Sequence, residues 1–317
     1  MRISASISTI PLNKLSTTVQ QLDEAGIDAY HLDSVESREI FQFADRLRGL
    51  TKKPFDLHLI TSDPVKYWDE IRNSKIEATT LQLESLHSPL FVPQDLKGKV
   101  GLAVLASTPI TAFEVYRKNV SWLLIMMTTP GYSGGKFQPE HFANIIRYRE
   151  AYPEIPVYID GGVTHEVAYV LRMIGIRQIV SGSYLFSGTT VEESVQKLQN
   201  YSDSPWMLKD IMAKGTEFFS SSRQSFGVIA ETSFINENGE NINISRDANW
   251  TEALEQITAF SEVNGKALFV HENLPLAGLD TILSSLDFPA NYFFAVNDQH
   301  AVTGSLFFNP EINDSPV

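Results

Sequence analysis

Short apolar runs alternate with longer segments of helical periodicity over the first two hundred residues of the chain. The runs have the length and side-chain content of strands, and the intervening segments repeat their apolar residues at helical spacing. This alternation occurs eight times, with strands expected at 2–8, 29–34, 55–61, 79–85, 99–106, 122–129, 157–162 and 178–186. Helices are expected at 15–26, 37–50, 64–75, 109–119, 138–152, 165–175 and 190–200. The fourth connection, around 92–98, is stunted.

Eight strand–helix units within about 200 residues have the size and order of a closed parallel (β/α)8 TIM barrel. A doubly wound open sheet is the competing arrangement, and the number of units favours the barrel. In a barrel the active site lies at the carboxyl ends of the strands. Polar residues at those ends are therefore the candidates for chemistry.

The pattern changes after Tyr201, which predicts a barrel domain over 1–202 and a smaller α+β domain over 203–317. Helices are expected at 206–219, 249–263 and 276–287, and strands at 225–234, 241–245, 267–273, 291–298 and 300–308. The turn at 236–241 predicts a hairpin. The junction at 200–205 is short, which is typical of domains that pack together.

Composition narrows the function classes. The chain has 317 residues, 43% of them hydrophobic and 20% charged, and a formal net charge of −13. This acidity and the absence of a basic patch argue against nucleic acid and against a membrane surface as partners. No cysteine is present, so any metal must be held by His, Asp or Glu. No segment has the apolar run of a signal peptide or a membrane span, and a cytoplasmic location is expected.

Five polar residues follow the expected strands at positions that suit a site: Ser6, His31, Asp33, His58 and Asp160. His31 and Asp33 stand two apart on one strand, so their side chains share a face. Each residue alone has a plain structural explanation, as a core histidine or a turn-forming aspartate. Together, two imidazoles and two carboxylates on three strands predict a site for zinc, manganese, cobalt or ferrous iron.

Glycines mark a second part of the expected site. They occur in PGYSGG at 130–135, at Gly161 and Gly162, and at Gly182 before Ser183. Loops after strands seven and eight are the usual phosphate site of such barrels, and glycines allow close backbone approach. We therefore expect the phosphate group of a substrate to bind there, with backbone N–H groups supplying much of the attraction.

The stretches ISASI, HLD, DLHLI, PGYSGG, IDGG and SGSYLF occur in the order and approximate spacing of the ribulose-phosphate 3-epimerase family. The first 200 residues resemble that family throughout. The resemblance implies one divalent transition metal with His31, Asp33, His58 and Asp160 as ligands, and Asp33 and Asp160 as the acid/base pair. It also implies a sugar phosphate bound near Ser6, His58, Met126, Gly131, Gly134, Gly161, Gly162, Gly182 and Ser183.

The chemistry of inversion supports the same pair independently. Inverting a carbon next to a carbonyl needs one group to remove the proton and another, on the opposite face, to return it. Strands two and seven lie on different sides of a barrel mouth, so Asp33 and Asp160 can flank a substrate carbon. With this pair, the resemblance implies inversion of C3 of ribulose 5-phosphate or a related phosphoketose.

The chain also departs from the family pattern. The family's long loop after strand two is shortened here, because HLDSVESREIF runs directly into a helix. Ile60 stands where the family has methionine, Ser8 replaces an apolar residue, and PGYSGGK replaces the usual PGFGGQ. Ligands and bases are kept while the substrate lining changes, which favours a related or altered phosphoketose.

Two other functions compete with the epimerase. A non-catalytic sugar-phosphate sensor would account for the shortened loop and the added domain, but it would not need two opposed bases. A barrel lyase or decarboxylase is disfavoured because no lysine stands at the strand ends considered.

The pairs His271–Glu272 and Asp298–His300 at expected strand ends of the second domain suit turns or caps better than a site. That domain is expected to be structural, oligomerising or regulatory, and the protein a homo-oligomer.

Overall fold

The computed structural model describes residues 1–132, 134–214, 233–235, 241–243, 266–277, 290–298 and 302–307. The chain forms two compact units. The first contains residues 1–138, 151–168 and 176–201, and the second contains 139–150, 169–175 and 202–317. The domain boundary at 202/203 stays a prediction.

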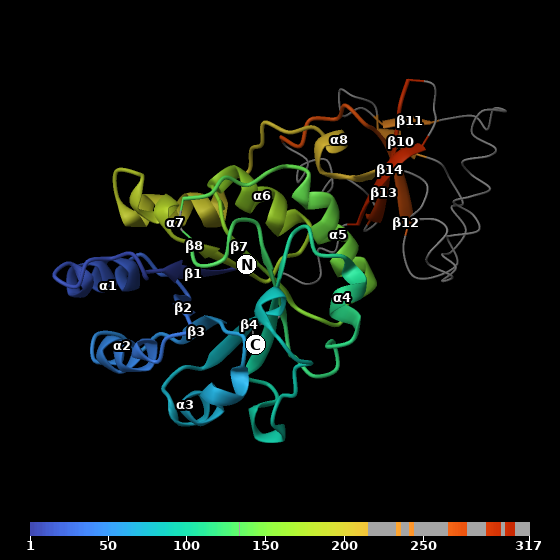
Figure 1. Ribbon diagram of the computed structural model, residues 1–317. Helices are drawn as coiled ribbons and strands as arrows, with labels where there is room; N and C mark the ends of the chain where they lie inside the picture. Colours follow the sequence, from blue (N-terminus) through green and yellow to red (C-terminus); the bar gives the residue numbers. More distant parts are fainter. Residues whose placement is uncertain are drawn as a thin grey trace. The chain divides into compact units, whose positions relative to one another are not determined.

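Eight parallel strands close into a barrel in the order of the chain. Figure 1 shows barrel strands surrounded by helices in the amino-terminal part. β1 pairs with β8 as well as with β2, so the barrel is confirmed and the open sheet is wrong. The strands are β1 (Arg2–Ser6), β2 (Ala29–Val35), β3 (Phe55–Ile60), β4 (Ala78–Gln82), β5 (Val100–Leu105), β6 (Leu123–Met126), β7 (Val157–Asp160) and β8 (Gln178–Ser181).

Helices connect these strands much as the apolar periodicity predicts. They are α1 (Leu15–Glu24), α2 (Glu39–Arg48), α3 (Trp68–Asn73), α4 (Ile110–Glu114), α5 (His141–Ala151), α6 (His165–Met173) and α7 (Val191–Asn200). Short 3-10 turns add η1 (Pro64–Tyr67) before α3 and η4 (Ser183–Phe186) after β8. The fourth connection holds only η2 (Leu83–Ser85) and η3 (Gln94–Leu96), which confirms that it is stunted.

Alternate residues of each barrel strand face opposite ways, one set towards the surrounding helices and the other towards the barrel interior. Tyr30 and Leu32 on β2, with Phe55 and Leu57 on β3, are fully buried, as residues that face the helices should be. The residues between them face the barrel interior, where β2 and β3 carry polar side chains. The register sets His31 beside Asp56 and Asp33 beside His58. Site residues thus occupy interior positions, while the outer apolar positions stabilise the fold.

An aromatic side chain fills the interior near the start of β5 and β6. The Trp122 Nε1 atom donates to Thr80 Oγ1 at 2.9 Å, and the indole stacks on Tyr158 with ring centroids 6.0 Å apart. A Cβ atom on Gly101 would lie only 2.0 Å from Trp122 Nε1. Glycine at position 101 therefore makes room for the indole.

The described strands of the second unit form a six-stranded sheet in the order β11-β10-β12-β13-β14-β9. Their bounds are β9 (Ala213–Lys214), β10 (Ser233–Ile235), β11 (Asn241–Asn243), β12 (Lys266–His271), β13 (Ala290–Val296) and β14 (Val302–Phe307). β10, β12 and β13 run parallel, and β10 and β11 are antiparallel partners, as the predicted hairpin requires.

One helix prediction in this region is wrong over its described part. Of the expected helix at 206–219, the described residues form α8 (Leu208–Ile211) and then a strand, because Ala213 and Lys214 pair with β14; positions 215–219 lie outside the described residues. The pairing gives the backbone at these positions partners in a sheet in place of helical ones. The expected helices at 249–263 and 276–287 lie outside the described residues, apart from the first two positions of the second.

The fit of Trp122 over Gly101 yields a stability prediction. Gly101→Ala should lower the free energy of unfolding by about 1–3 kcal/mol, because the new methyl group displaces the indole from its bond to Thr80. Urea unfolding followed by circular dichroism measures the change. Gly49→Ala is the control, since Gly49 has a φ of −72° that alanine adopts without strain. Equal stability of Gly101→Ala and the wild-type protein would contradict the packing argument.

Candidate metal and acid/base site

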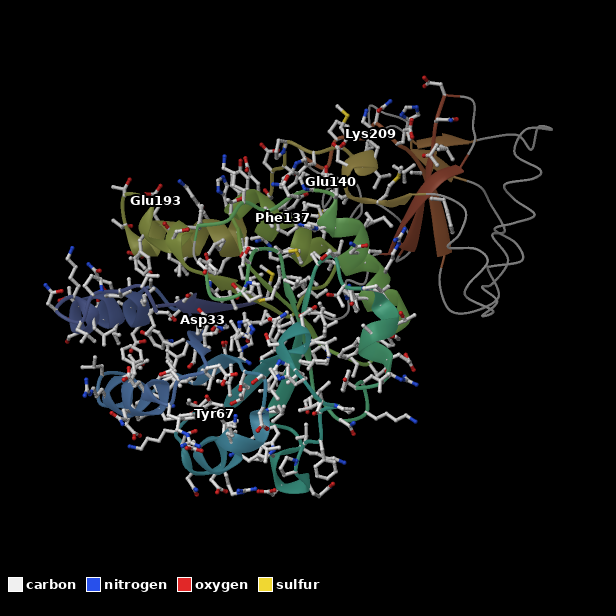
Figure 2. The ribbon with its side chains drawn as sticks, in the orientation of Figure 1. Asp33, Tyr67, Phe137, Glu140, Glu193 and Lys209 are labelled. Carbon is white, nitrogen blue, oxygen red and sulfur yellow. The ribbon has the colours of Figure 1, made fainter. Side chains whose placement is uncertain are left out.

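Four of the predicted site residues meet at one end of the barrel interior. One nitrogen or oxygen atom from each of His31, Asp33, His58 and Asp160 can be chosen so that all lie within 4.8 Å of one another. Asp33, labelled in Figure 2, lies towards the carboxyl end of β2. His58 lies on β3, and Asp160 is the last residue of β7. The register of β2 and β3 sets Asp33 beside His58, because interior residues of adjacent parallel strands lie side by side. Closure of the barrel brings Asp160, from β7, to the same end of the interior.

Contacts within this cluster are close but leave room for an ion. Asp33 Oδ1 lies 3.3 Å from His31 Nε2 and 3.4 Å from His58 Nδ1. Asp160 Oδ2 lies 3.7 Å from His31 Nε2. Both histidines are buried, with exposed fractions of 1% for His31 and 0% for His58.

His58 supplies a direct test of whether the cluster fits a metal. Its Nδ1 atom is buried and has no hydrogen-bond partner. A buried nitrogen without a partner is costly unless something else satisfies it. A cation among two imidazoles and two carboxylates would satisfy it, and this donor set suits zinc, manganese, cobalt or ferrous iron. The residues present therefore fit a divalent transition metal.

The two carboxylates of the cluster differ in proton affinity. Burial would raise the pKa of Asp33, but the charge and hydrogen bond of His31, together with the nearby His58, hold it well below its usual range. Burial raises the pKa of Asp160 to about 6, a shift that the His31 charge opposes and the Asp33 charge reinforces. Two carboxyl groups with pKa values pushed apart are typical of an acid/base pair.

Asp56 is a functional candidate that sequence reasoning missed. It accepts hydrogen bonds from Ser4 Oγ and from Gln178 Nε2 at 2.9 Å, and it pairs with His31 Nδ1. Burial disfavours a protonated His31, but the charges of Asp56 and Asp33 outweigh it and raise the pKa of His31 well above its ordinary value. The sequence signal that could have identified Asp56 is its spacing from His58, because the two stand two apart on one strand, as His31 and Asp33 do.

Ser8 is a second missed contact. Its Oγ accepts from the backbone N–H of Asp33 at 2.9 Å and donates to Asp33 Oδ2 at 3.4 Å. The sequence marked Ser8 only as a departure from the family pattern. Its hydroxyl supports the strand-two carboxylate at the barrel mouth.

The predicted substrate residues fall into groups around the same mouth. Ser6 is beside His31 in the register of β1 and β2, and a Cβ atom on Gly182 would lie 3.5 Å from Ser6 Cβ. Met126 is beside Asp160 in the register of β6 and β7, and its side chain is buried in the interior. These residues and the cluster therefore occupy neighbouring positions.

Of the two predicted glycines in the loop after β6, Gly131 is close to the ends of site strands and Gly134 is not. A Cβ atom on Gly131 would lie 3.3 Å from Val35 Cγ2 and 3.4 Å from Ile60 Cδ1. Gly134 has a φ of 90° with nothing near its Cβ position.

Gly161 and Gly162 occupy crowded positions in the loop after β7. A Cβ atom on Gly161 would lie 2.4 Å from Thr128 Oγ1, and one on Gly162 would lie 2.4 Å from the backbone nitrogen of Phe137. Phe137 is labelled in Figure 2. The loops after β6 and β7 thus pack against each other, whereas Ser183 is exposed at the start of η4.

The loop after β2 is short, as the sequence predicts. α2 begins at Glu39, and Glu36 adopts a left-handed φ of 47°. Its carboxylate accepts from Ser62 N at 2.6 Å, from Thr61 Oγ1 at 3.0 Å and from the Tyr67 hydroxyl at 3.3 Å. These bonds tie the end of β2 to the loop after β3 and offset the cost of the unusual backbone conformation.

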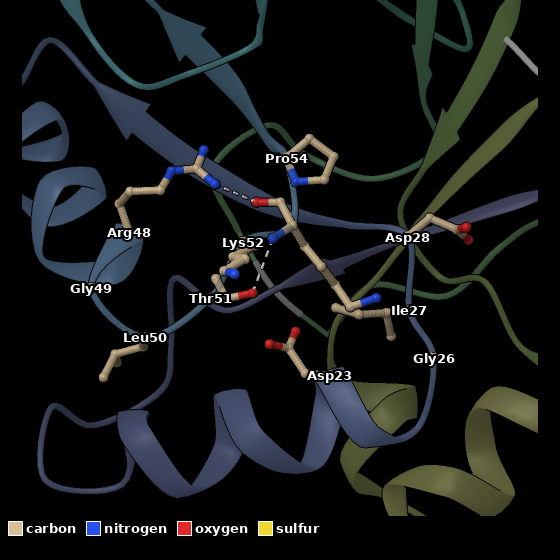
Figure 3. A pocket seen from close by; sticks show the side chains of 11 residues that line it. Asp23, Gly26, Ile27, Asp28, Arg48, Gly49, Leu50, Thr51, Lys52 and Pro54 are labelled. Carbon is tan, nitrogen blue, oxygen red and sulfur yellow. Dashed lines mark hydrogen bonds between the residues drawn. The ribbon is translucent and has the colours of Figure 1, made fainter.

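A shallow pocket of about 820 Å³ lies at the opposite end of the strands. Figure 3 shows that residues from the loop before β2 and the loop before β3 line it, including Asp28 and Lys52. Arg48 is engaged there with the carbonyl oxygen of Lys53 at 2.8 Å. In barrels this end serves stability, so the pocket is not the candidate active site.

None of the described helices is both long and apolar enough to span a membrane.

Proteins similar to this chain include ribulose-phosphate 3-epimerases of several organisms. A chloroplastic ribulose-5-phosphate-3-epimerase of Arabidopsis thaliana is 26% identical over 212 residues, covering 62% of this chain and 75% of the plant protein. A ribulose-phosphate 3-epimerase of Synechocystis sp. is 27% identical over 213 residues, covering 62% of this chain and 93% of its own length.

A further relative, ribulose-phosphate 3-epimerase of Methanocaldococcus jannaschii, is 24% identical over 212 residues, covering 63% of this chain and 90% of its own length. The sequence model of the Ribulose-phosphate 3 epimerase family matches residues 2–186, which is more than half of the chain. This match includes the cluster of two histidines and two aspartates. The chain belongs to the ribulose-phosphate 3-epimerase family.

Proposed function

We propose that the protein is a metal-dependent epimerase that inverts C3 of ribulose 5-phosphate or a related phosphoketose by two-base proton transfer. As a member of its family the chain is a carbohydrate epimerase. The observation that carries the finer proposal is the pair Asp33 and Asp160, on strands β2 and β7, both bordering the two histidines. A protein that only bound the sugar phosphate would not need both carboxylates.

Each carboxyl group has a definite task in this reaction. One carboxylate takes the proton from C3, and the electron pair of the broken C–H bond moves towards the C2 carbonyl oxygen. The other carboxyl group donates its proton to the opposite face of C3, and the carbonyl forms again. With Asp33 ionised and the pKa of Asp160 at about 6, the pair can start with the single proton that this exchange requires.

A divalent metal held by His31, Asp33, His58 and Asp160 would supply positive charge against the negative charge that develops on the substrate oxygens. Asp56 holds His31 with its Nε2 atom towards the other ligands, because the Nδ1 atom is engaged. Burial of both histidines keeps bulk water from screening these charges.

For the phosphate group we propose the loops at Gly161–Gly162 and Gly182–Ser183. The chain is strongly acidic, so backbone N–H groups have to contribute much of the attraction. Gly182 lies next to Ser6, which is adjacent to His31 in the strand register, and this supports a substrate that reaches from the cluster to these loops. Cytoplasmic location and homo-oligomer formation stay predictions.

The metal site predicts about one divalent transition metal per purified chain, since one set of four candidate ligands converges in the part of the chain that the structure describes. His31→Gln and His58→Gln should each lower the metal content measured by elemental analysis after metal-replete growth. His87→Gln, which changes an exposed histidine, is the control and should keep the wild-type content. A wild-type protein without bound metal under these conditions would refute the site.

The acid/base assignment predicts that Asp33→Asn and Asp160→Asn each lower net epimerisation by about 100- to 10,000-fold, the usual contribution of a positioned acid or base. Either single variant can keep slow solvent exchange at the face served by its remaining carboxylate. The assay is C3 deuterium incorporation in D2O, with metal content measured in parallel because both residues are proposed ligands. Unchanged epimerisation by metal-replete Asp160→Asn would refute its role. Phosphoketose binding without exchange would support a sensor.

The phosphate proposal predicts that crystals soaked in inorganic phosphate hold the anion against the backbone N–H groups of the loops at Gly161–Gly162 and Gly182–Ser183. Inorganic phosphate should then compete with the phosphoketose in kinetic assays. An anion bound only in the carboxyl-terminal region, with no competition, would contradict the proposed orientation of the substrate.

A further inference from the structure

The two ring nitrogens of His58 have different surroundings. Nδ1 lies 3.4 Å from Asp33 Oδ1, faces the cluster and has no hydrogen-bond partner. Nε2 lies 2.8 Å from Oε1 of Gln82, a residue that is only 2% exposed. A neutral imidazole carries its proton on one nitrogen and a lone pair on the other. Only the tautomer with the proton on Nε2 presents a lone pair to the cluster.

The orientation of the Gln82 amide decides between these tautomers. Its Nε2 atom donates to Glu84 Oε2, so its Oε1 atom is left to accept a proton from His58. With the amide reversed, its oxygen would meet the Glu84 carboxylate and its NH2 group would donate to His58 Nε2. That arrangement moves the imidazole proton to Nδ1, where it faces Asp33 and occupies the position of the lone pair.

Glu84 fixes the direction of the whole chain of hydrogen bonds. It lies in η2, directly after β4, and its Oε1 atom accepts from the backbone N–H of Leu105 at 2.9 Å and from Thr108 Oγ1. A backbone N–H can only donate, so Glu84 must present an acceptor to Leu105. A carboxylate is an acceptor on both oxygens, so it also presents an acceptor to Gln82.

We propose that Gln82 and Glu84 are positioning residues that hold His58 in the tautomer with its proton on Nε2 and its Nδ1 lone pair facing the metal ligands. The metal-binding consequence of this assignment rests on the proposed metal site, whereas the tautomer itself can be measured without metal. β4 contributes no residue to the metal cluster, yet Gln82 determines what its neighbour on β3 can bind.

Glu84→Gln should reverse the direction of these hydrogen bonds without changing the shape of the side chain. The new side chain keeps its oxygen towards Leu105 N and Thr108 Oγ1, so its NH2 group takes the place of Oε2. Gln82 must then turn its oxygen towards residue 84 and its NH2 group towards His58. The proton of His58 is therefore expected to move to Nδ1.

The exchanged pair is the matched rescue. In the double variant with Gln82→Glu and Glu84→Gln, the amide at 84 donates to the carboxylate at 82. That carboxylate accepts from His58 Nε2, so the wild-type tautomer returns. The double variant also has the wild-type net charge and composition, which separates hydrogen-bond direction from a simple loss of charge.

The tautomer can be read in the full-length, metal-free protein labelled with 15N-histidine. Long-range 1H–15N correlation spectra distinguish protonated from unprotonated ring nitrogens, and His58→Gln identifies the signal of His58 among the seven histidines. Metal affinity is measured by competition for Co2+ against a chelator. Misdirected outer hydrogen bonds cost about 10- to 100-fold in metal affinity, so Glu84→Gln should lose that factor and the double variant should regain it.

Glu193→Gln is the control for the loss of one surface carboxylate, because Glu193 pairs with Lys197 on α7. It should leave both the tautomer and Co2+ affinity unchanged. Thermal unfolding of all variants shows whether each is folded. If a variant is unfolded, Gln82→Met provides the second test: it removes the Nε2 acceptor and should weaken Co2+ binding without restoration by Glu84→Gln.

Three outcomes distinguish the positioning role of Gln82 and Glu84 from the proposed metal site. An Nε2-protonated His58 in wild type and double variant, with an Nδ1-protonated His58 in Glu84→Gln, supports the proposal. The same tautomer in folded wild type and Glu84→Gln overturns it. A wild-type protein with the Nε2 tautomer and no Co2+ binding supports the positioning role but refutes the metal site on which the proposed function depends.

Discussion

The register of the parallel barrel is the constraint on which the site depends. Because neighbouring parallel strands set interior residues side by side, His31 and Asp56 meet across β2 and β3, as do Asp33 and His58. A slip of one residue in either strand would move its polar side chains outward among the helices and bring apolar ones inward. The buried residues Tyr30, Phe55 and Leu57 hold the register, since their burial would be lost in the slipped arrangement.

Charges inside a barrel are costly unless they offset one another. The cluster satisfies this requirement in two layers. The inner layer sets the carboxylates of Asp33 and Asp160 against two imidazoles. The outer layer consists of Asp56 behind His31 and Gln82 behind His58. Ser4 and Gln178 donate to Asp56, and Gln82 donates to Glu84. The outer layer engages one nitrogen of each imidazole, so that the other nitrogen faces the cluster.

Hydrogen bonds fix the conformation of the short loop after β2 at the mouth of the barrel. Glu36 holds the end of β2 against the loop after β3 through three hydrogen bonds. Gly131 approaches Val35 and Ile60, where a larger residue would press against both side chains. The rim near Asp33 therefore includes apolar and small residues beside the polar Ser8 and Glu36.

The sequence by itself determined the elements and the same-face pairs within one strand. Alternating apolar runs and helical segments predict all eight barrel strands, and residues two apart share a face by local geometry alone, as His31 and Asp33 do. Polar residues at strand ends, together with the resemblance to a family, supplied the four candidate ligands that the structure brings together. Each of these inferences needs only local backbone geometry or a motif.

Tertiary structure decided the rest, because contacts between strands depend on register and on loop paths that no local pattern records. Asp56 behind His31 requires the pairing of β2 with β3, and Gln82 behind His58 requires the pairing of β3 with β4. The expected helix at 206–219 is interrupted at Ala213 and Lys214 for the same reason, since these residues pair with β14, ninety residues away in the chain. A strand is stabilised by its partner, and the partner's identity is a property of the folded chain.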